Sequence, residues 1–192
     1  MKAIITKLIR VLTVAPLMAL VTLITLYVYD KGLFDSRLSL LFISIAFLVV
    51  LPLLAYPLQP VIPHFKNKGR EGQRNLAMIF AVSGYILGCI TNLFLSAPTA
   101  LWLIYLEYLL SGLLVLIINK AFHLRASAHA CGIIGPAAML AYFGIIAALP
   151  IGLVLYATAL WASLEMKRHT VPQFIGGAII PVAVLAVLHF IL

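Results

Sequence analysis

Apolar residues run through this chain in long segments that are separated by short polar stretches. Seven apolar segments can be delimited, at residues 8–29, 38–58, 76–95, 99–118, 131–148, 150–164 and 172–192. A helix needs roughly 20 apolar residues to cross about 30 Å of hydrocarbon, because each residue adds about 1.5 Å. The pattern therefore predicts an all-α protein, a polytopic transmembrane helix bundle with six or seven spans.

The composition agrees with this prediction. Of the 192 residues, 65% are hydrophobic and 9% are charged, whereas soluble domains are roughly half apolar and a quarter charged. We expect one integral membrane domain over residues 1–192. The first span, 8–29, either belongs to the bundle or is peripheral to a six-helix core that covers about residues 38–192.

The positive charges lie mainly in the connections between apolar segments. A net charge of +8 would suggest nucleic-acid binding in a soluble protein, but here the orientation of the spans and anionic headgroups explain it. If the segments alternate in direction, eleven of the thirteen Lys and Arg residues fall on one face, and only Lys31 and Arg37 fall on the other. The cation-rich face, with the N-terminus, is predicted to be cytoplasmic, and no nucleic-acid partner is expected.

Three polar stretches on the cation-rich face are candidates for chemistry, at residues 66–74, 119–129 and 167–173. The last two each place a histidine, His129 or His169, near an arginine and a small hydroxyl residue. Cations and O–H donors bind phosphate oxygens, and an imidazole can act as a nucleophile or as a proton donor near neutral pH. The pattern indicates a phosphate site. The alternatives are that the stretch 66–74 only fixes topology and that each histidine only begins a helix; His123 is expected at headgroup level.

The residues Arg125-Ala126-Ser127-Ala128-His129-Ala130-Cys131-Gly132 and Lys167-Arg168-His169-Thr170-Val171-Pro172-Gln173 resemble the second and third motifs of the type-2 phosphatidic acid phosphatase superfamily. The resemblance covers the last 70 residues better than the first 120. It implies that His169 is a nucleophile that is transiently phosphorylated and that His129 is the general acid. No metal and no cofactor are implied. The phosphate-binding residues that it implies are Arg125, Ser127 and Arg168, with Lys66, Lys68 and Arg74 in place of the first motif.

Two positions depart from the third motif of that family. The family usually has an arginine six residues before the histidine, where this chain has Ser163, and an aspartate four residues after it, where this chain has Gln173. Gln173 can accept a hydrogen bond from the ring and is the expected orienting residue, although an amide does not stabilise a charged imidazole as a carboxylate does. Similar variants occur among small bacterial and archaeal members, which implies the plasma membrane of such a cell.

The function expected from these residues is hydrolysis of a lipid phosphate or diphosphate, of polyprenyl or phosphatidyl type, through a phosphohistidine intermediate at the membrane interface. The alternative is a non-catalytic lipid-binding or transport protein with a phosphatase-like fold. A third hypothesis, a channel or carrier for small solutes, rests on Asn92 and on Glu107, an acid inside the fourth span that is expected to bond with Asn92 or a tyrosine. The expected partner is a membrane lipid, and a homo-oligomer is an open alternative.

Overall fold

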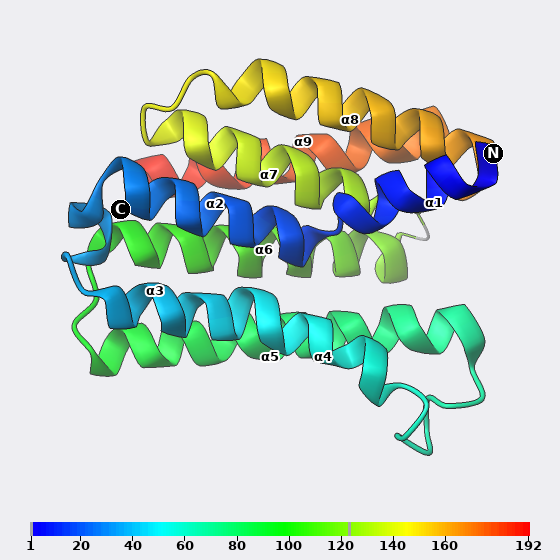
Figure 1. Cartoon of the computed structure of the whole chain (residues 1–192), viewed down its shortest axis with the longest axis horizontal. Coiled ribbons are helices and arrows are strands. Elements are labelled where there is room, and N and C mark those ends of the chain that lie inside the picture. The colour runs from blue at the N-terminus through cyan, green and yellow to red at the C-terminus, as the bar shows by residue number, and fades with distance from the viewer. Residues whose placement is uncertain (1, 123) are drawn as a thin grey trace.

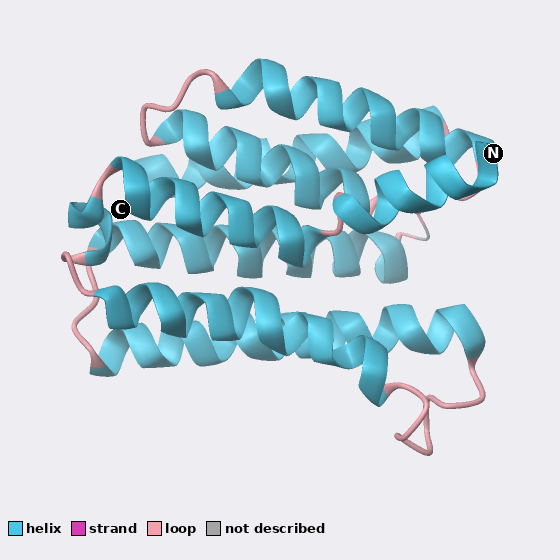
Figure 2. Ribbon diagram, in the orientation of Figure 1, coloured by secondary structure: helices cyan, strands magenta, loops and turns pink. Residues whose placement is uncertain are grey.

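The part of the chain that a computed structural model describes, residues 2–122 and 124–192, consists of helices and loops (Figure 2). His123, for which a position at headgroup level was expected, lies outside the described residues. In chain order the elements are α1 (Lys2–Leu12), α2 (Ala15–Tyr29), a 3-10 helix η1 (Lys31–Phe34), α3 (Leu38–Ile45), a π-helical turn η2 (Ala46–Val50), α4 (Leu51–Leu58), α5 (Gly69–Phe94), α6 (Thr99–Ala121), α7 (Ala128–Tyr142), α8 (Ala148–Glu165) and α9 (Val171–Ile191).

Five of the helical segments are long and apolar enough to cross a membrane, and a sixth is formed if α1 and α2, which are bent by 49° relative to each other, count as one span. The predicted all-helical membrane bundle is therefore confirmed. The segment predicted at 131–148 differs from the helix observed there, because α7 has 15 residues and ends at Tyr142. Gly144 follows with a φ of +95°, a backbone conformation that glycine adopts at little cost and that ends the helix.

The first span is packed into the bundle. Pro16 lies in the first turn of α2, where its missing N–H costs no helical hydrogen bond. A proline inside a helix would break it, so α1 and α2 do not form one unbroken helix. Ala19, Leu23 and Leu26 of α2 are at most 1% exposed. The part of the segment 8–29 that forms α2 therefore packs into the bundle.

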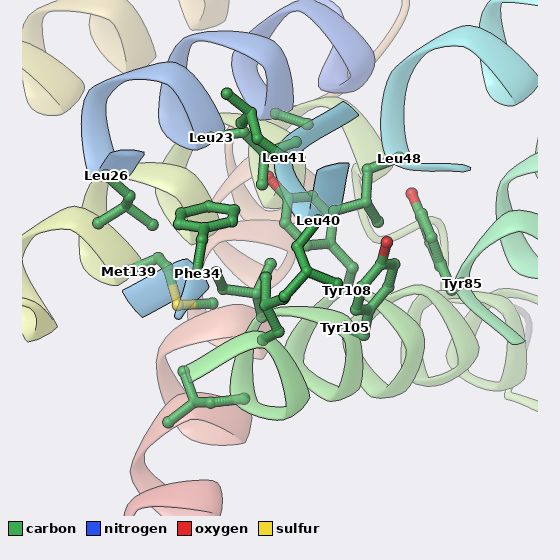
Figure 3. Close-up of a cluster of buried hydrophobic side chains, with 14 of the residues drawn as sticks. Leu23, Leu26, Phe34, Leu40, Leu41, Leu48, Tyr85, Tyr105, Tyr108 and Met139 are labelled. Carbon is green, nitrogen blue, oxygen red and sulfur yellow. The ribbon is translucent and has the colours of Figure 1, made fainter. Parts of the chain in front are cut away.

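Buried apolar side chains of α2, η1, α3, η2, α5 and α6 form one cluster with Met139 of α7 and Leu185 of α9 (Figure 3). The cluster packs these elements together, and it lies mainly away from the end at which α7 and α9 begin. The side chains labelled in the close-up are Leu23, Leu26, Phe34, Leu40, Leu41, Leu48, Tyr85, Tyr105, Tyr108 and Met139.

Successive spans run in opposite directions, so their connections gather at two ends of the bundle (Figure 1). One end holds the N-terminal part of α1, the α4–α5 and α6–α7 connections and the α8–α9 turn. We call it the cationic end, because eleven of the thirteen Lys and Arg residues lie on α1, in these connections or in the helical turns that adjoin them. The helix directions therefore agree with the alternation on which the charge count was based. Lys31 and Arg37 lie at the other end.

Candidate functional site

The start of α7 is held against α9 at the cationic end. Ser127 caps α7, because its Oγ accepts a hydrogen bond from the Ala130 N–H at 3.2 Å. The backbone N–H of Ser127 donates to the carbonyl of Gln173 at 2.9 Å. Gly177 permits this approach, because a Cβ there would overlap the Ser127 carbonyl oxygen and lie 2.9 Å from its carbon and nitrogen. These contacts fix His129, in the first turn of α7, beside the start of α9.

The turn between α8 and α9 presents Arg168 and His169. Lys167 has a left-handed φ of +50°, and the N–H of Arg168 donates to the Ser163 carbonyl at 2.9 Å while the N–H of Lys167 donates to Leu164. This is the Schellman arrangement that reverses a chain after a helix. Two residues after His169, α9 begins with a capping box in which Thr170 is the N-cap. The two side chains are therefore held in a short, well-defined turn.

The bend between α1 and α2 brings two further polar residues to the same place. The Arg10 Nη1 donates to the Ser163 Oγ at 2.9 Å, and the Thr13 Oγ1 lies 2.9 Å from the His129 Nε2. Sequence reasoning missed both residues and took Arg10 only as a topology signal. The signal that could have found Arg10 is its position inside the apolar segment 8–29, because a cation within a span is costly and marks a functional candidate. Its guanidinium lies beside Ser163, where the resemblance leads one to expect an arginine.

Positive charge dominates the surroundings of both histidines. The pKa of His169 is lowered, first by burial and then by the charges of Arg10, Arg74 and Arg168, while the side chain of Gln173 acts in the opposite direction. A neutral imidazole, the form that can act as a nucleophile, is therefore favoured at position 169.

His129 lies within electrostatic reach of Arg10, Arg168 and His169. The pKa of Arg168 is also lowered, by burial and then by the neighbouring Arg70. We call Arg10, Arg70, Arg74, Arg168, His129 and His169 the Arg–His cluster. Glu71 lies in the first turn of α5 with Arg70 and Arg74, but no salt bridge within the described residues joins a carboxylate to a cation of the cluster.

Of the residues predicted for the site, Arg168 and His169 lie within electrostatic reach of His129, and Arg74 and Arg168 lie within reach of His169. Lys66, Lys68 and Arg125 are exposed. The Lys68 Nζ donates to the His64 Nε2 at 2.8 Å and lies over the ring of Phe65, and no hydrogen bond within the described residues connects Lys66, Lys68 or Arg125 to either histidine. Their predicted role in phosphate binding gains no support from these positions.

Two predicted residues have structural roles at the site. The Ser127 hydroxyl is fully buried and serves as the cap of α7. The Gln173 Oε1, which was expected to accept from the His169 ring, accepts from the Thr170 N–H at 3.2 Å. The Nδ1 of His169 and the Nε of Arg168 are both buried without a hydrogen-bond partner among the described residues. Both atoms are therefore free of protein partners within the cluster.

Glu107 lies apart from the Arg–His cluster, buried in α6. Its Oε1 accepts from the Ser111 Oγ at 3.1 Å. The polar partner of Glu107 is therefore Ser111 rather than Asn92 or a tyrosine, since a residue four positions later on the same helix lies next to the carboxyl group. In the described part of the chain, no group of three His, Cys, Asp or Glu side chains has the arrangement of a metal site.

An apolar groove lies between α8 and α9, with α7 at its floor, and has a volume of about 480 Å³. We call it the α8–α9 groove. The ring of Tyr156, in its wall, lies 5.0 Å from the ring of Phe174, which lies 6.3 Å from the ring of His169. The groove therefore leads toward the Arg–His cluster. Its lining residues are Ile134, Leu153, Tyr156, Ile175, Ala178, Ile179, Val182, Ala183 and Ala186.

No family model, curated protein or solved structure matches this chain.

Proposed function

We propose that this protein is a lipid phosphatase that hydrolyses a phosphate or diphosphate ester at the membrane interface through a phosphohistidine. The observation that carries the proposal is the Arg–His cluster, in which Arg10 and Arg168 both bond to Ser163 and act on His169 without a salt bridge to a carboxylate among the described residues. Like charges at short range repel, and a bound anion removes this repulsion. The ion pair found among the described residues joins Asp35 and Arg37 at the opposite end. A phosphate group has the charge that the cluster lacks.

The two histidines can perform the chemistry in two steps. In the first step a neutral His169 nitrogen attacks phosphorus, the bond to the lipid oxygen breaks, and protonated His129 gives its proton to the departing alkoxide. In the second step water attacks the phosphohistidine, His129 takes a proton from that water, and phosphate leaves. The arginines stabilise the charge on the transferring phosphoryl group. The two imidazoles supply nucleophile and acid, so this reaction requires no metal.

The α8–α9 groove supports a lipid as the substrate. Between Ile175 and Ala186, at its two ends on α9, the helix rises about 16 Å at 1.5 Å per residue, which is roughly half of the 30 Å hydrocarbon thickness. Ile175 lies about 6 Å along α9 from its first residue, Val171, by the same rise, and His169 precedes Val171 by two residues. A hydrocarbon chain of one leaflet, of polyprenyl or acyl type, would lie in the groove while its phosphate reaches the Arg–His cluster.

The proposal includes membership of the type-2 phosphatidic acid phosphatase superfamily as a divergent form. The order of the two histidine stretches and the chemistry of the cluster support this assignment. The site is proposed to lie at the cytoplasmic face, because the cationic end follows the distribution of positive residues in short loops. The proposed location is the plasma membrane of a bacterial or archaeal cell.

The direct test measures inorganic phosphate released from polyprenyl phosphate and from phosphatidic acid by purified protein in the presence of EDTA. We expect activity in the wild type and in His189→Ala, because His189 lies near the opposite end of α9 and bonds with Tyr142. We expect loss of activity in His169→Ala. Activity retained by His169→Ala would exclude the proposed nucleophile.

A non-catalytic lipid-binding or transport protein is the second candidate. The observation that favours it is the His169 Nδ1, which has no orienting hydrogen-bond partner among the described residues, since a nucleophilic imidazole is usually held by a partner on its other nitrogen. Wild-type protein that binds vesicles containing phosphatidic acid in preference to phosphatidylcholine, but releases no phosphate, would establish this second function.

A further inference from the structure

Arg10 has the properties of a ligand for an anion. Its guanidinium offers five N–H donors, and the hydrogen bond that it makes within the described residues is the one to the Ser163 Oγ. The side chain is partly buried, and the neighbouring charges that act on it include Arg168 and Arg70. A partly buried cation next to other cations is unfavourable unless an anion shares the space. The guanidinium fork fits two oxygens of a phosphate group at once.

Thr13 determines which nitrogen of His129 carries a proton. The Thr13 hydroxyl has one hydrogen, which it donates to the Ile9 carbonyl at 2.7 Å. The contact of 2.9 Å between the Thr13 Oγ1 and the His129 Nε2 therefore requires that the imidazole donates through Nε2–H. In the neutral ring Nδ1 is then unprotonated, so Nδ1 is the nitrogen that gains and loses the proton. Thr13 is only 4% exposed, so water does not compete for this contact.

We propose that α1 and the bend after it complete the phosphate site, with Arg10 as a direct ligand of the phosphate and Thr13 as the positioning residue that fixes the tautomer of His129. This inference rests on the proposed phosphatase function for the role of Thr13, whereas the role of Arg10 requires only that phosphate binds. The 49° bend between α1 and α2 turns both side chains toward α7 and α8. The first helix is thus more than a membrane anchor.

The test of Arg10 measures binding of inorganic phosphate to the purified protein, by titration calorimetry and by the shift in thermal unfolding. Arg10→Ala is expected to weaken binding about 10- to 100-fold, the usual effect of losing a hydrogen bond to a charged group. Arg10→Lys keeps the charge without the fork, so it should fold as wild type and still bind about tenfold more weakly.

Two controls separate a ligand from a structural contact. Lys7→Ala removes an exposed cation of the same helix and should change phosphate binding less than about twofold, as expected for a screened surface charge. Ser163→Ala removes the partner of Arg10 but keeps its charge, so it should bind phosphate more tightly than Arg10→Ala. Wild-type affinity in Arg10→Ala, or equal losses in Ser163→Ala and Arg10→Ala, would overturn the assignment of Arg10.

The test of Thr13 compares Thr13→Val with Thr13→Ser. Thr13→Val should lower kcat about tenfold with KM nearly unchanged, a smaller loss than the roughly 100-fold or more that the proton donor itself contributes, and Thr13→Ser should restore kcat. ¹⁵N NMR of labelled histidine, with His129→Gln to assign the signal, should show Nε2–H in the wild type and both tautomers in Thr13→Val. Unchanged tautomers in Thr13→Val, or equal kcat losses in Thr13→Val and Thr13→Ser, would refute the role.

These measurements also separate this inference from the proposed function. Wild-type protein that releases no phosphate from lipids, but loses phosphate binding in Arg10→Ala, would contradict the phosphatase and support Arg10 as a ligand. Protein that hydrolyses lipid phosphates equally well with Arg10→Ala would support the phosphatase and contradict the ligand.

Discussion

Gly177→Ala tests whether the start of α7 is packed directly on α9. A Cβ at position 177 would overlap the carbonyl oxygen of Ser127 and lie 2.9 Å from its carbon and nitrogen. All three are backbone atoms, so no side-chain rotation relieves the overlap, and the helices have to separate by the better part of an ångström. Overpacking of this kind costs about 1–3 kcal/mol of unfolding free energy, which is roughly 2–12 °C in Tm for a chain of this size. The same shift would strain the hydrogen bond from the Ser127 N–H to the Gln173 carbonyl.

The matched control is Gly176→Ala. A Cβ at position 176 meets nothing within 4 Å, and alanine is favoured over glycine inside a helix by about 0.5–1 kcal/mol. We therefore expect Gly176→Ala to keep or slightly raise Tm, while Gly177→Ala lowers both Tm and phosphate binding. Thermal unfolding of both variants in the same detergent makes the comparison. Equal Tm values for the two variants would refute the close packing of α7 on α9.

Three further predictions follow from the groove, the charges and the buried acid. Ala183→Trp fills the α8–α9 groove and should raise KM for a long-chain lipid phosphate about tenfold, the equivalent of roughly 55 Å² of lost apolar contact at about 25 cal/mol/Å². KM for a short-chain phosphate, and KM of the exposed control Val187→Trp for either substrate, should not change in this way. Equal effects of Ala183→Trp on both chain lengths would exclude the groove as the lipid site. Arg74→Ala removes a charge that lowers the pKa of His169, so this pKa should rise and the acidic limb of the kcat/KM profile should move to higher pH; an unmoved limb contradicts the electrostatic coupling. Glu107→Gln should keep both Tm and phosphate release, because an amide oxygen can still accept from the hydroxyl of Ser111, whereas lost function with an intact Tm would favour the hypothesis of a solute pathway.

The helical bundle could be predicted from the sequence because apolar segments of span length are a strong signal. The boundaries were less accurate where single residues decide them. α7 ends earlier than predicted because of the turn at Gly144, and α5 begins at Gly69 rather than near residue 76, so that Arg70 and Arg74 lie on a helix.

The Arg–His cluster contains more of the predicted residues from the starts of α7 and α9 than from the first half of the chain. His129 and His169 could be paired from the sequence because two spans return the chain to the same end. Arg10 and Thr13 could not be paired with them, because their contacts with Ser163 and His129 join residues 153 and 116 positions apart. Such contacts depend on how α1 bends and packs, which no local pattern encodes. Gln173 could be predicted as a site residue, but whether its oxygen faces the ring or the backbone depends on the geometry of the cap.

The phosphoryl group on His169 is the intermediate that distinguishes the proposed mechanism from every alternative. Purified protein should be mixed with lipid phosphate labelled in its phosphorus and stopped at high pH, and the labelled peptides should be identified by mass spectrometry. The account predicts a phosphohistidine at position 169 in the wild type and in Gly176→Ala, and no labelled peptide in His169→Ala. Release of phosphate by protein that never carries the label on His169 would contradict the account.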